Sequence, residues 1–310
     1  MTPTLGIDLG GTFARAAVVD ERGNILAVAK TALTERSPEA VVESIAQAAA
    51  EAMRLAGTPV RAVGVGAAGQ IPLDSGLIAV APNLGWRNVP LGPMLGERLG
   101  HAVRLVNDLS AAAWGELHAG AGRGAQDLFV VFVGSGVGSA IVANGQLLRG
   151  ANGVGAELGH VKMVPAGRLC GCGEHGCLEA YAGGHNLIHQ ARELVEQGRS
   201  PELQRLCGGD TGRLTPVSLE QAMQAGDAAA RVVYERAAQM LALAVANQIT
   251  VLNPARLILG GGVLTHCPEL RRRVLEGVQA WSSRTSREGL LVADAELGDD
   301  SGLIGAALLA

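Results

Sequence analysis

Apolar residues recur along the first hundred positions in short runs that predict strands and in one longer helical pattern. Three successive runs, separated by glycine-containing turns, predict strands at residues 5–8, 14–19 and 24–30. A helix is predicted to start with Ser37 as its N-cap and Pro38 in its first turn, and to end at Gly57. Buried strands are predicted at residues 62–66 and 103–107, which gives the order β-β-β-α-β-α-β.

The same pattern begins again in the second half of the chain. Residues 127–134, 138–143 and 146–148 predict three further strands, with Asn144 and Gly145 as a two-residue hairpin turn. Helices are predicted at residues 186–197, 218–224 and 228–252, and a strand at residues 256–259. Two halves that each begin with three strands and continue with helices indicate an internal duplication of an α/β unit, with a ligand-binding cleft between the halves.

The composition narrows the class of protein. The chain has 310 residues and is 48% hydrophobic, which is enough for one large or two medium cores. Its net charge of -4 and its 3% aromatic content disfavour nucleic-acid binding. The N-terminus lacks a basic segment followed by a long apolar one, and the most apolar later run is interrupted by Asn247 and Gln248. We therefore expect a cytoplasmic protein that does not bind a membrane.

One histidine and three cysteines are concentrated in a short segment. His160 precedes Cys170, Cys172 and Cys177, which are interleaved with glycines, and these four side chains would complete a tetrahedral Zn²⁺ site. The first two cysteines are too near each other to form a comfortable disulfide, and a redox or disulfide loop is the alternative reading. Because four protein ligands fill the coordination shell, the sequence predicts a closed, structural zinc site.

Three glycine-rich turns follow predicted strands: Gly10-Gly11-Thr12, Gly134-Ser135-Gly136 and Gly260-Gly261-Gly262. Such turns expose backbone N–H groups to a phosphate or an adenosine, although a single one is more often only a hairpin. The sequence contains no Walker-type phosphate loop. Residues 64–69 match the dinucleotide fingerprint, but Pro72 and a loop follow where that fold requires a helix, so we reject this reading.

Three carboxylates are candidates for chemistry. Asp108 follows a predicted strand and precedes an alanine-rich helical stretch, where it could accept a proton from an attacking hydroxyl or merely cap the helix. Glu157 and Glu179 flank the cysteine segment and could grip sugar hydroxyls, although solvated surface glutamates are more common.

Several motifs together resemble a known family. Residues 5–12 and 132–138 resemble the two phosphate motifs of the superfamily of sugar kinases, heat-shock proteins and actin, and residues 257–263 resemble its adenosine motif. The segment from Glu157 to Glu179, with its histidine and cysteines, resembles the signature of the repressor, open reading frame and kinase (ROK) family. These matches occur in the expected order, so the chain is identified as a member of that family.

The resemblance implies an α/β architecture, the duplicated actin-like and ribonuclease-H-like ATPase fold, with two domains and a central cleft. Residues 1–108 would form a small N-terminal domain, on which a C-terminal helix at residues 300–310 packs. Residues 109–299 would form a larger domain that contains the zinc loop at residues 157–179. The resemblance also implies a homodimer or homotetramer that acts on a hexose and ATP with Mg²⁺, alongside the structural Zn²⁺.

The resemblance further implies roles for particular residues. Asp108 would be the catalytic base that deprotonates the 6-hydroxyl of the sugar. The sugar-binding residues would be Asn83, Asn107, Asp108, Glu157, His160 and Glu179. Asp8 would help to place Mg²⁺, while the phosphates would contact Gly10, Gly11, Thr12, Gly134, Ser135 and Gly136, and the adenosine Gly261 and Gly262. His160 would use one ring nitrogen on zinc and direct the other toward the sugar.

The choice of substrate stays open at this stage. Residues 66–72 read GAAGQIP where family kinases commonly have G-x-P-G-x-V-D, and this loop lies on the sugar side in the family. Residues 81–86 resemble those of glucose kinases, so glucose is expected first, with N-acetylmannosamine, N-acetylglucosamine and other hexoses as alternatives. Polyphosphate as donor and a sugar sensor without turnover are further alternatives. A DNA-binding repressor is disfavoured because the first motif begins at Leu5, which leaves no room for a preceding helix-turn-helix domain.

Overall fold

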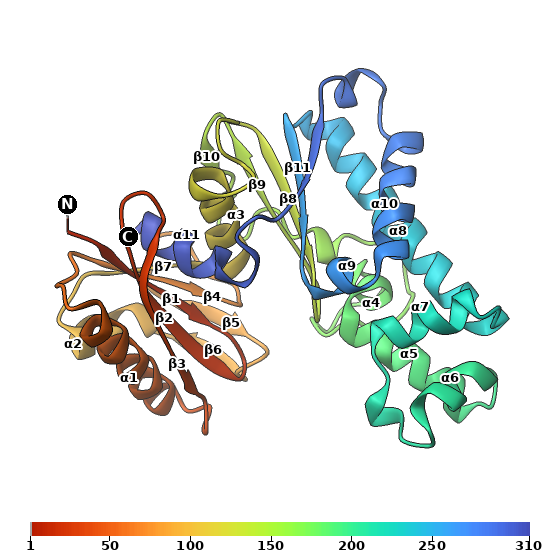
Figure 1. The fold of residues 1–310 in the computed structure, drawn as a ribbon, viewed down its shortest axis with the longest axis horizontal. Coiled ribbons are helices and arrows are strands. Elements are labelled where there is room, and N and C mark those ends of the chain that lie inside the picture. Colours follow the sequence, from red (N-terminus) through yellow and green to blue (C-terminus); the bar gives the residue numbers. More distant parts are fainter. Residues whose placement is uncertain (1) are drawn as a thin grey trace. The chain divides into compact units, whose positions relative to one another are not determined.

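Two sheets with the same strand order organise the chain (Figure 1). The computed structural model describes residues 2–310. The first sheet has the order β3-β2-β1-β4-β7. Its strands are β1 (Thr4–Leu9), β2 (Phe13–Val19), β3 (Ile25–Ala32), β4 (Val63–Ala67) and β7 (Val103–Asn107). β1 pairs antiparallel with β2 and parallel with β4, and β4 pairs parallel with β7.

The second sheet has the order β10-β9-β8-β11-β12. Its strands are β8 (Leu128–Val133), β9 (Val137–Ala143), β10 (Gln146–Leu147), β11 (Arg256–Gly260) and β12 (Leu291–Asp294). If the five strands of each sheet are numbered 1 to 5 along the chain, both sheets have the spatial order 3-2-1-4-5. This shared order is expected of a duplicated α/β unit. The hairpin between β9 and β10 turns at Asn144 and Gly145, whose φ angles of 50° and 72° are those of the predicted two-residue turn.

The described residues form two compact units. The first unit contains the chain up to Val130, together with Ala140–Ala156 and Ala293–Ala310. The second contains Val131–Ser139 and Glu157–Val292. Residues 109–130, which we expected in the larger C-terminal domain, cluster with the first unit because helix α3 (Asp108–Ala119) packs on helix α11 (Ser301–Leu309) and contacts β4 and β7.

Both faces of the first sheet are covered by helices (Figure 1). Helix α1 (Pro38–Ala56) packs on β2 and β3, and α2 (Leu91–Leu99) packs on α1 and β7. Because side chains alternate along a strand, Leu5, Ile7 and Leu9 face the core beneath α1, whereas Ala17 and Val19 face α11. α1 begins at Pro38 as predicted, but the side chain of Ser37 makes no capping hydrogen bond.

Glycines allow α11 to approach the sheet and α3 closely. A Cβ built at Gly6 or Gly64 would overlap carbonyl oxygens of α11, and one at Gly305 would overlap the carbonyl oxygen of Ala111 on α3. Gly64, the first glycine of the rejected dinucleotide fingerprint, therefore serves helix packing.

A buried carboxylate fixes the segment that leads into α11. Glu116 is fully buried and accepts hydrogen bonds from the backbone N–H groups of Ala121, Glu296 and Leu297, at 2.8 to 3.1 Å. Three N–H donors satisfy most of the acceptor capacity of this carboxylate. α3 and the chain before α11 are thereby held together.

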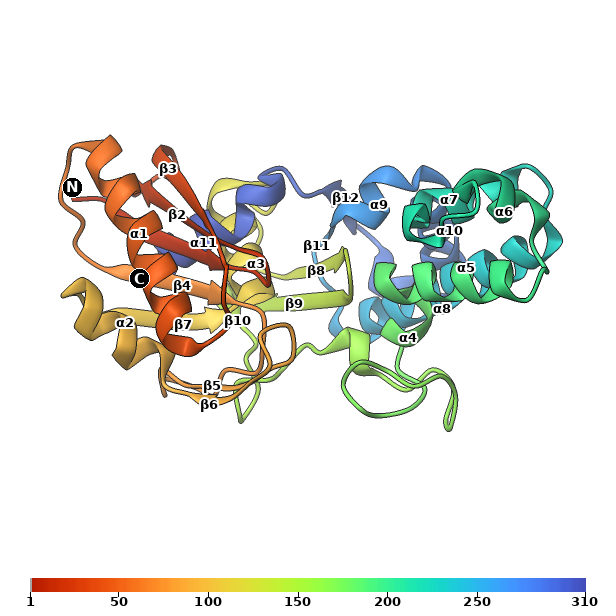
Figure 2. The same ribbon diagram turned by 90° about the horizontal axis from the view of Figure 1, so that it is seen from below.

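A separate strand pair is inserted in the first half. β5 (Ile78–Ala81) and β6 (Trp86–Val89) form an antiparallel hairpin, which Figure 2 shows apart from the five-stranded sheet. The loop at residues 66–72 pairs with this hairpin through an isolated antiparallel bridge between Gln70 and Val80. No strand was predicted at either arm of this hairpin from the sequence.

The second unit is mostly helical. Its α-helices are α4 (Glu179–Ala182), α5 (Gly184–Glu196), α6 (Pro201–Cys207), α7 (Pro216–Gln224), α8 (Ala228–Leu252), α9 (Gly262–His266) and α10 (Pro268–Trp281). The 3₁₀ helices of the chain are η1 (Leu158–His160), η2 (Thr211–Arg213), η3 (Thr285–Arg287) and η4 (Gly298–Asp300). α8 packs on α10 and α7, and the buried Tyr234 hydroxyl on α8 donates to Glu220 on α7.

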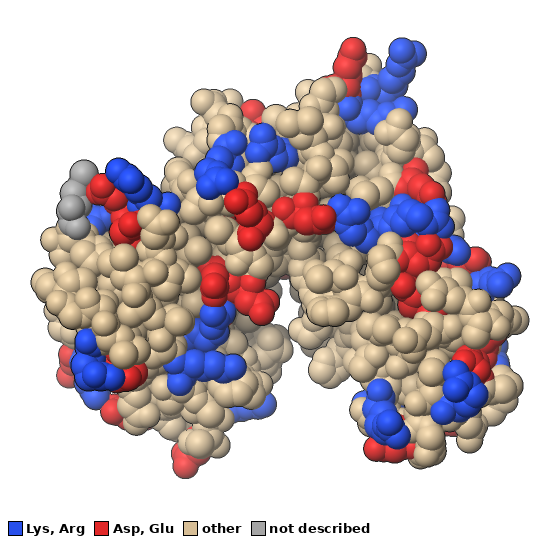
Figure 3. All heavy atoms as spheres, viewed as in Figure 1, with Lys and Arg blue, Asp and Glu red and all other residues tan. Residues whose placement is uncertain are grey.

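Charge and length give two further observations. On the face shown in Figure 3, acidic and basic side chains are intermingled over both units. Among residues 2–310, no helix combines the length and the apolar character that crossing a membrane requires.

The close packing of α11 predicts the effect of one substitution. Gly64→Ala should lower the free energy of unfolding by about 2–3 kcal/mol, because its Cβ would collide with the Ala306 backbone. Gly96→Ala within α2 is the matched control: its Cβ would meet only an ordinary contact at 3.5 Å, and its stability should stay within about 1 kcal/mol of the parent. Urea unfolding measures both. Equal stability of the two variants would contradict this packing.

Candidate functional site

The four predicted metal ligands lie together in the second unit. The ligand atoms of His160, Cys170, Cys172 and Cys177 are all within 4.8 Å of one another. The Sγ atoms of Cys172 and Cys177 are 3.8 Å apart, and the Cys170 Sγ is 3.9 Å from His160 Nδ1. A tetrahedral zinc ion with Zn–S bonds of about 2.3 Å requires S···S separations of about 3.8 Å. The donor set and its spacing therefore fit Zn²⁺.

The loop that carries these ligands has little regular structure of its own. Figure 2 shows the chain before α4 as an extended loop. Two isolated antiparallel bridges, Lys162 with Cys177 and Leu169 with His175, bring its segments together. Gly176 has a φ of 79° and lies against the Val164 backbone, where a Cβ would not fit. The glycines between the cysteines thus allow the tight path that the ligand positions need.

His160 presents its two ring nitrogens to different groups. Nδ1 faces Cys170, and Nε2 lies 3.9 Å from the Oε2 of Glu157. Burial raises the pKa of the Glu157 carboxyl, and the nearby charge of Glu179 raises it further. The two predicted sugar-binding groups, Glu157 and His160, are therefore adjacent, and the ring nitrogen that faces the cysteines is not the one that faces Glu157.

Glu179 joins the cysteine loop to the second glycine turn. Its Oε2 accepts a hydrogen bond from the N–H of Val137 at 3.0 Å, and its Oε1 lies 3.7 Å from the Cys170 Sγ. The carboxylate also fills the space where a Cβ at Gly136 would lie. From the sequence, Glu179 was predicted only to bind sugar. This link depends on a contact between segments 42 residues apart, which no local pattern announces.

The second and third glycine turns are built differently. The carbonyl oxygens of Gly134 and Ser135 accept hydrogen bonds from the first N–H groups of α5, at 2.9 and 2.8 Å. In the third turn, Gly261 has a φ of 87° and lies against the backbone of Val133, so its glycine is required by packing and conformation. A Cβ at Gly262 would meet nothing closer than 3.8 Å.

The first glycine turn lies beside Asp8 and the β5–β6 hairpin. Asp8 lies near the C-terminal end of β1, and Asn83 lies next to Gly11, where a Cβ on the glycine would be 3.5 Å from that of Asn83. Burial raises the pKa of the Asp8 carboxyl, Arg15 opposes this, and Asp299 and Asp300 reinforce it. Arg15 itself pairs with Asp300 and donates to the carbonyl oxygen of Asp299 at 2.7 Å.

Asn107 and Asp108 lie at the start of α3, and Asn107 is the residue that caps the helix. The Asn107 side chain caps the helix by accepting from the N–H groups of Leu109 and Ser110, at 2.9 and 3.2 Å. Its amide nitrogen donates to the carbonyl oxygen of Gly69 at 3.2 Å. The N-cap is therefore Asn107, whereas Asp108 is the first residue of the helix and its Oδ1 lies 2.9 Å from the N–H of Leu109.

Comparison with known proteins identifies the family. The model of the ROK family matches residues 4–310. The chain belongs to the ROK family.

Relatives of this ROK protein resemble it over nearly their whole length. The glucokinase of Streptomyces coelicolor is 36% identical over 99% of this chain and 97% of its own. The crystal structure of a ROK family glucokinase from Streptomyces griseus, in complex with glucose and AMPPNP, has a TM-score of 0.80 at 36% identity and covers 99% of both chains. The ROK hexokinase of Thermus thermophilus has a TM-score of 0.85 at 33% identity, over 100% of this chain and 98% of that one. The actin-like ATPase fold and the family resemblance are therefore confirmed.

The predicted site residues of this ROK protein fall into two groups. The first unit contains Asp8, Gly10, Gly11, Thr12, Asn83, Asn107 and Asp108. The second unit contains Gly134, Ser135, Gly136, Glu157, His160, Glu179, Gly261, Gly262 and the cysteine ligands.

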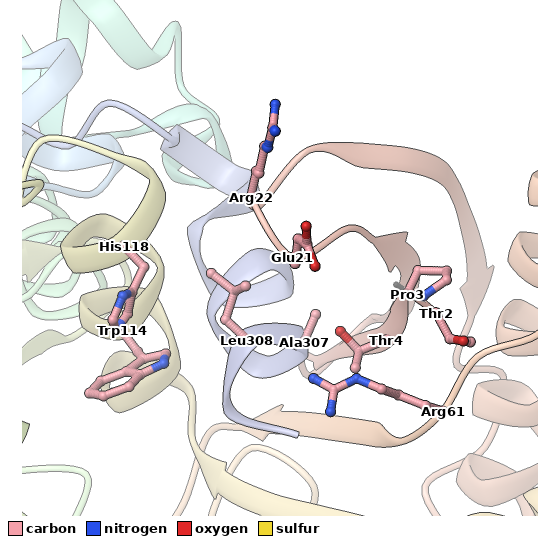
Figure 4. Close-up of a pocket in the computed structure, with 10 residues that line it drawn as sticks. All are labelled: Thr2, Pro3, Thr4, Glu21, Arg22, Arg61, Trp114, His118, Ala307 and Leu308. Carbon is pink, nitrogen blue, oxygen red and sulfur yellow. The ribbon is translucent and has the colours of Figure 1, made fainter.

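A cavity of about 720 Å³ lies elsewhere in the first unit (Figure 4). It is found at the start of β1 and the end of α11, and its lining includes Arg61, Trp114 and His118. In Figure 4 the rings of Trp114 and His118 lie on the other side of α11 from Arg61. None of the predicted site residues lines this cavity.

The raised pKa of Asp8 predicts that the ionised form of this carboxyl lowers the stability of the fold. Folding disfavours its ionised form, and this cost is present above the folded-state pKa and is relieved as the pH falls through it. Asp8→Asn should therefore raise the free energy of unfolding at pH 7, and the gain should shrink toward acidic pH.

Asp20→Asn is the control with the opposite sign. Slight burial raises the pKa of the Asp20 carboxyl, but hydrogen bonds from Asn24 and from the N–H of Arg22 outweigh this and lower it. Folding therefore favours the ionised form, and Asp20→Asn should lose stability at pH 7. Thermal unfolding at pH 7 and pH 5 measures both variants. An Asp8→Asn variant less stable than the parent at pH 7 would contradict the assignment of a destabilising buried charge.

Proposed function

We propose that this ROK protein transfers the γ-phosphoryl group of ATP to the 6-hydroxyl group of glucose. The observation that carries the proposal is the full-length similarity to the Streptomyces griseus glucokinase, whose crystal structure holds glucose and AMPPNP. The named glucokinase of Streptomyces coelicolor supports the same substrate. The chain keeps the residue types that this reaction requires: a base, carboxylates for sugar hydroxyls and glycine turns for phosphates.

In the proposed reaction Asp108 is the general base. Its carboxylate accepts the proton of the sugar 6-hydroxyl while the oxygen forms a bond to the γ-phosphorus, and the bond from that phosphorus to the leaving ADP oxygen breaks. Its position supports this role: Asn107 is the N-cap of α3, and the partly buried Asp108 is the first residue of that helix, directly after the parallel strand β7. Ligands bind at the C-terminal ends of parallel strands in α/β folds.

The remaining groups bind and position the substrates. Asp8 lies near the C-terminal end of β1 and would hold the Mg²⁺ that accompanies ATP. Gly10, Gly11, Thr12, Gly134, Ser135 and Gly136 would contact phosphate, and Gly261 and Gly262 the adenosine. Asn83, Asn107, Glu157, His160 and Glu179 would contact sugar hydroxyls. For Asn107, one amide hydrogen is engaged with Gly69, which leaves the other for the sugar.

Zinc would be structural in this account. His160, Cys170, Cys172 and Cys177 would complete its coordination, so the ion takes no part in phosphoryl transfer. When bound, zinc would supply a rigid crosslink that fixes the orientation of the His160 ring, whose Nε2 lies 3.9 Å from Glu157.

The function is tested by ADP release from Mg²⁺-ATP in the presence of glucose, mannose, N-acetylglucosamine, N-acetylmannosamine or fructose. Glucose should give the highest kcat/KM. Asp108→Asn should keep glucose affinity nearly unchanged and lower turnover at least about 100-fold, equivalent to about 3 kcal/mol of barrier. Asp210→Asn, at the N-cap of η2, is the control and should turn over like the parent. Normal turnover in Asp108→Asn would exclude Asp108 as the base, and preference for another sugar would exclude glucose.

The zinc assignment predicts the metal content of the purified protein. Elemental analysis should find one zinc ion per chain. Cys172→Ser, which removes the exposed ligand of the cluster, should lose that zinc and weaken glucose binding through the displaced His160. A zinc-free parent protein with full glucose affinity would contradict the structural role.

A further inference from the structure

Lys162 lies against one of the zinc-ligand cysteines. Its Nζ is 3.0 Å from the Sγ of Cys177, and it also forms an ion pair with Glu174. Lys30 and Lys162 are the only lysines in a sequence that has 25 basic residues of both kinds. Lysine is therefore rare in this chain, and one of the two faces the metal cluster.

The backbone register determines this contact. Lys162 and Cys177 are partners in an isolated antiparallel bridge, so their side chains leave the same face. Hydrogen bonds on either side fix the pairing: Leu178 N–H donates to the Val161 oxygen at 2.9 Å, and Met163 N–H donates to the Gly176 oxygen at 2.8 Å. The register therefore places the base of the Lys162 side chain beside Cys177, from where its Nζ reaches the sulfur.

The charges of the centre explain what the lysine contributes. A zinc ion bound by three thiolates and one neutral imidazole carries a net charge of -1, because three negative charges outweigh the two positive ones of the metal. Cys177 is completely buried, whereas the Lys162 side chain is 41% exposed. The ammonium group thus brings a positive charge and an N–H donor to a thiolate that has little contact with water.

Glu174 holds the other end of the arrangement. Its backbone oxygen accepts a hydrogen bond from the Cys170 N–H at 2.8 Å, and its carboxylate pairs with Lys162. The Glu174 side chain is 68% exposed, and an ion pair so accessible to water contributes little stability by itself. The contact with the sulfur is the one expected to matter.

We propose that Lys162 is a positioning residue of the zinc centre: it donates a hydrogen bond to the Cys177 thiolate, offsets the negative charge of the centre and slows the loss of zinc. The proposal rests on the zinc site of the proposed function, and it does not depend on phosphoryl transfer.

The test is the release of zinc from the purified, zinc-loaded protein to an excess of a chromogenic chelator. Lys162→Met keeps the length of the side chain and removes the charge and the donor, and it should release zinc about tenfold faster, as expected for the loss of a partner of a metal ligand. Lys162→Arg keeps both and should release zinc at close to the parent rate. Glu174→Gln breaks only the ion pair and should have a smaller effect than Lys162→Met.

A second readout reports the thiolate directly. In the cobalt-substituted protein, Lys162→Met should move the thiolate-to-cobalt charge-transfer band to lower energy, because a thiolate without its hydrogen bond is a better electron donor. Lys162→Arg should leave the band near its original position.

The outcomes separate this inference from the proposed function. Parent-like zinc release and an unshifted band in Lys162→Met would overturn it, and so would a Glu174→Gln variant that loses zinc as fast as Lys162→Met. A purified parent protein without zinc would overturn both this inference and the zinc assignment. Faster zinc release in Lys162→Met from a protein that phosphorylates none of the sugars would support this inference while the proposed phosphoryl transfer fails.

Discussion

The constraint on which we propose the loop between β10 and α4 depends is a metal-held crosslink among His160, Cys170, Cys172 and Cys177, whose ligand atoms lie together. Between residues 161 and 178 the described chain forms no helix, and its pairing is limited to isolated bridges. Such a segment has little cooperative structure to repay the entropy of ordering its backbone. Four ligand atoms within 4.8 Å of one another offer a metal-held alternative to a packed core. In our proposal, Glu157 and His160, which we assign to the sugar, would depend on the same crosslink for their positions.

The loop is linked by hydrogen bonds to other parts of the second unit. Glu179 follows the last cysteine by two residues and accepts the N–H of Val137 in the second glycine turn. That turn in turn accepts hydrogen bonds from the first turn of α5. A change in the conformation of the loop at residues 157–179 would therefore shift the second glycine turn, which we assign to phosphate. In the first unit, glycines let α11 pack closely against β1 and β4.

Hydrophobic periodicity and turn residues predicted the elements whose formation depends mainly on neighbouring residues in the sequence. Both groups of three strands, α1, α8 and the hairpin at Asn144 and Gly145 lie close to where periodicity and turn residues predicted them. The ligand cluster was also predicted, because cysteine and histidine spacing within a short loop is itself a local signal. α10 was missed although Leu270, Val274 and Val278 recur at helical spacing, since the charged residues between them obscured the pattern.

Features that depend on long-range register could not be predicted in this way. The hydrogen bond from Val137 to Glu179 and the contact of Lys162 with Cys177 both require knowing which segments lie opposite each other. The capping role of Asn107 was hidden for a different reason: both Asn107 and Asp108 are good N-cap residues, and only the backbone decides between them.

The central claim is that the metal-held loop presents the sugar-binding groups. Calorimetric titration with glucose, before and after removal of zinc by a chelator under conditions where the protein stays folded, tests it most directly. We expect glucose affinity to fall at least about tenfold without zinc, while the affinity for a non-hydrolysable ATP analogue should be little changed. Unchanged glucose affinity in the zinc-free, folded protein would contradict it.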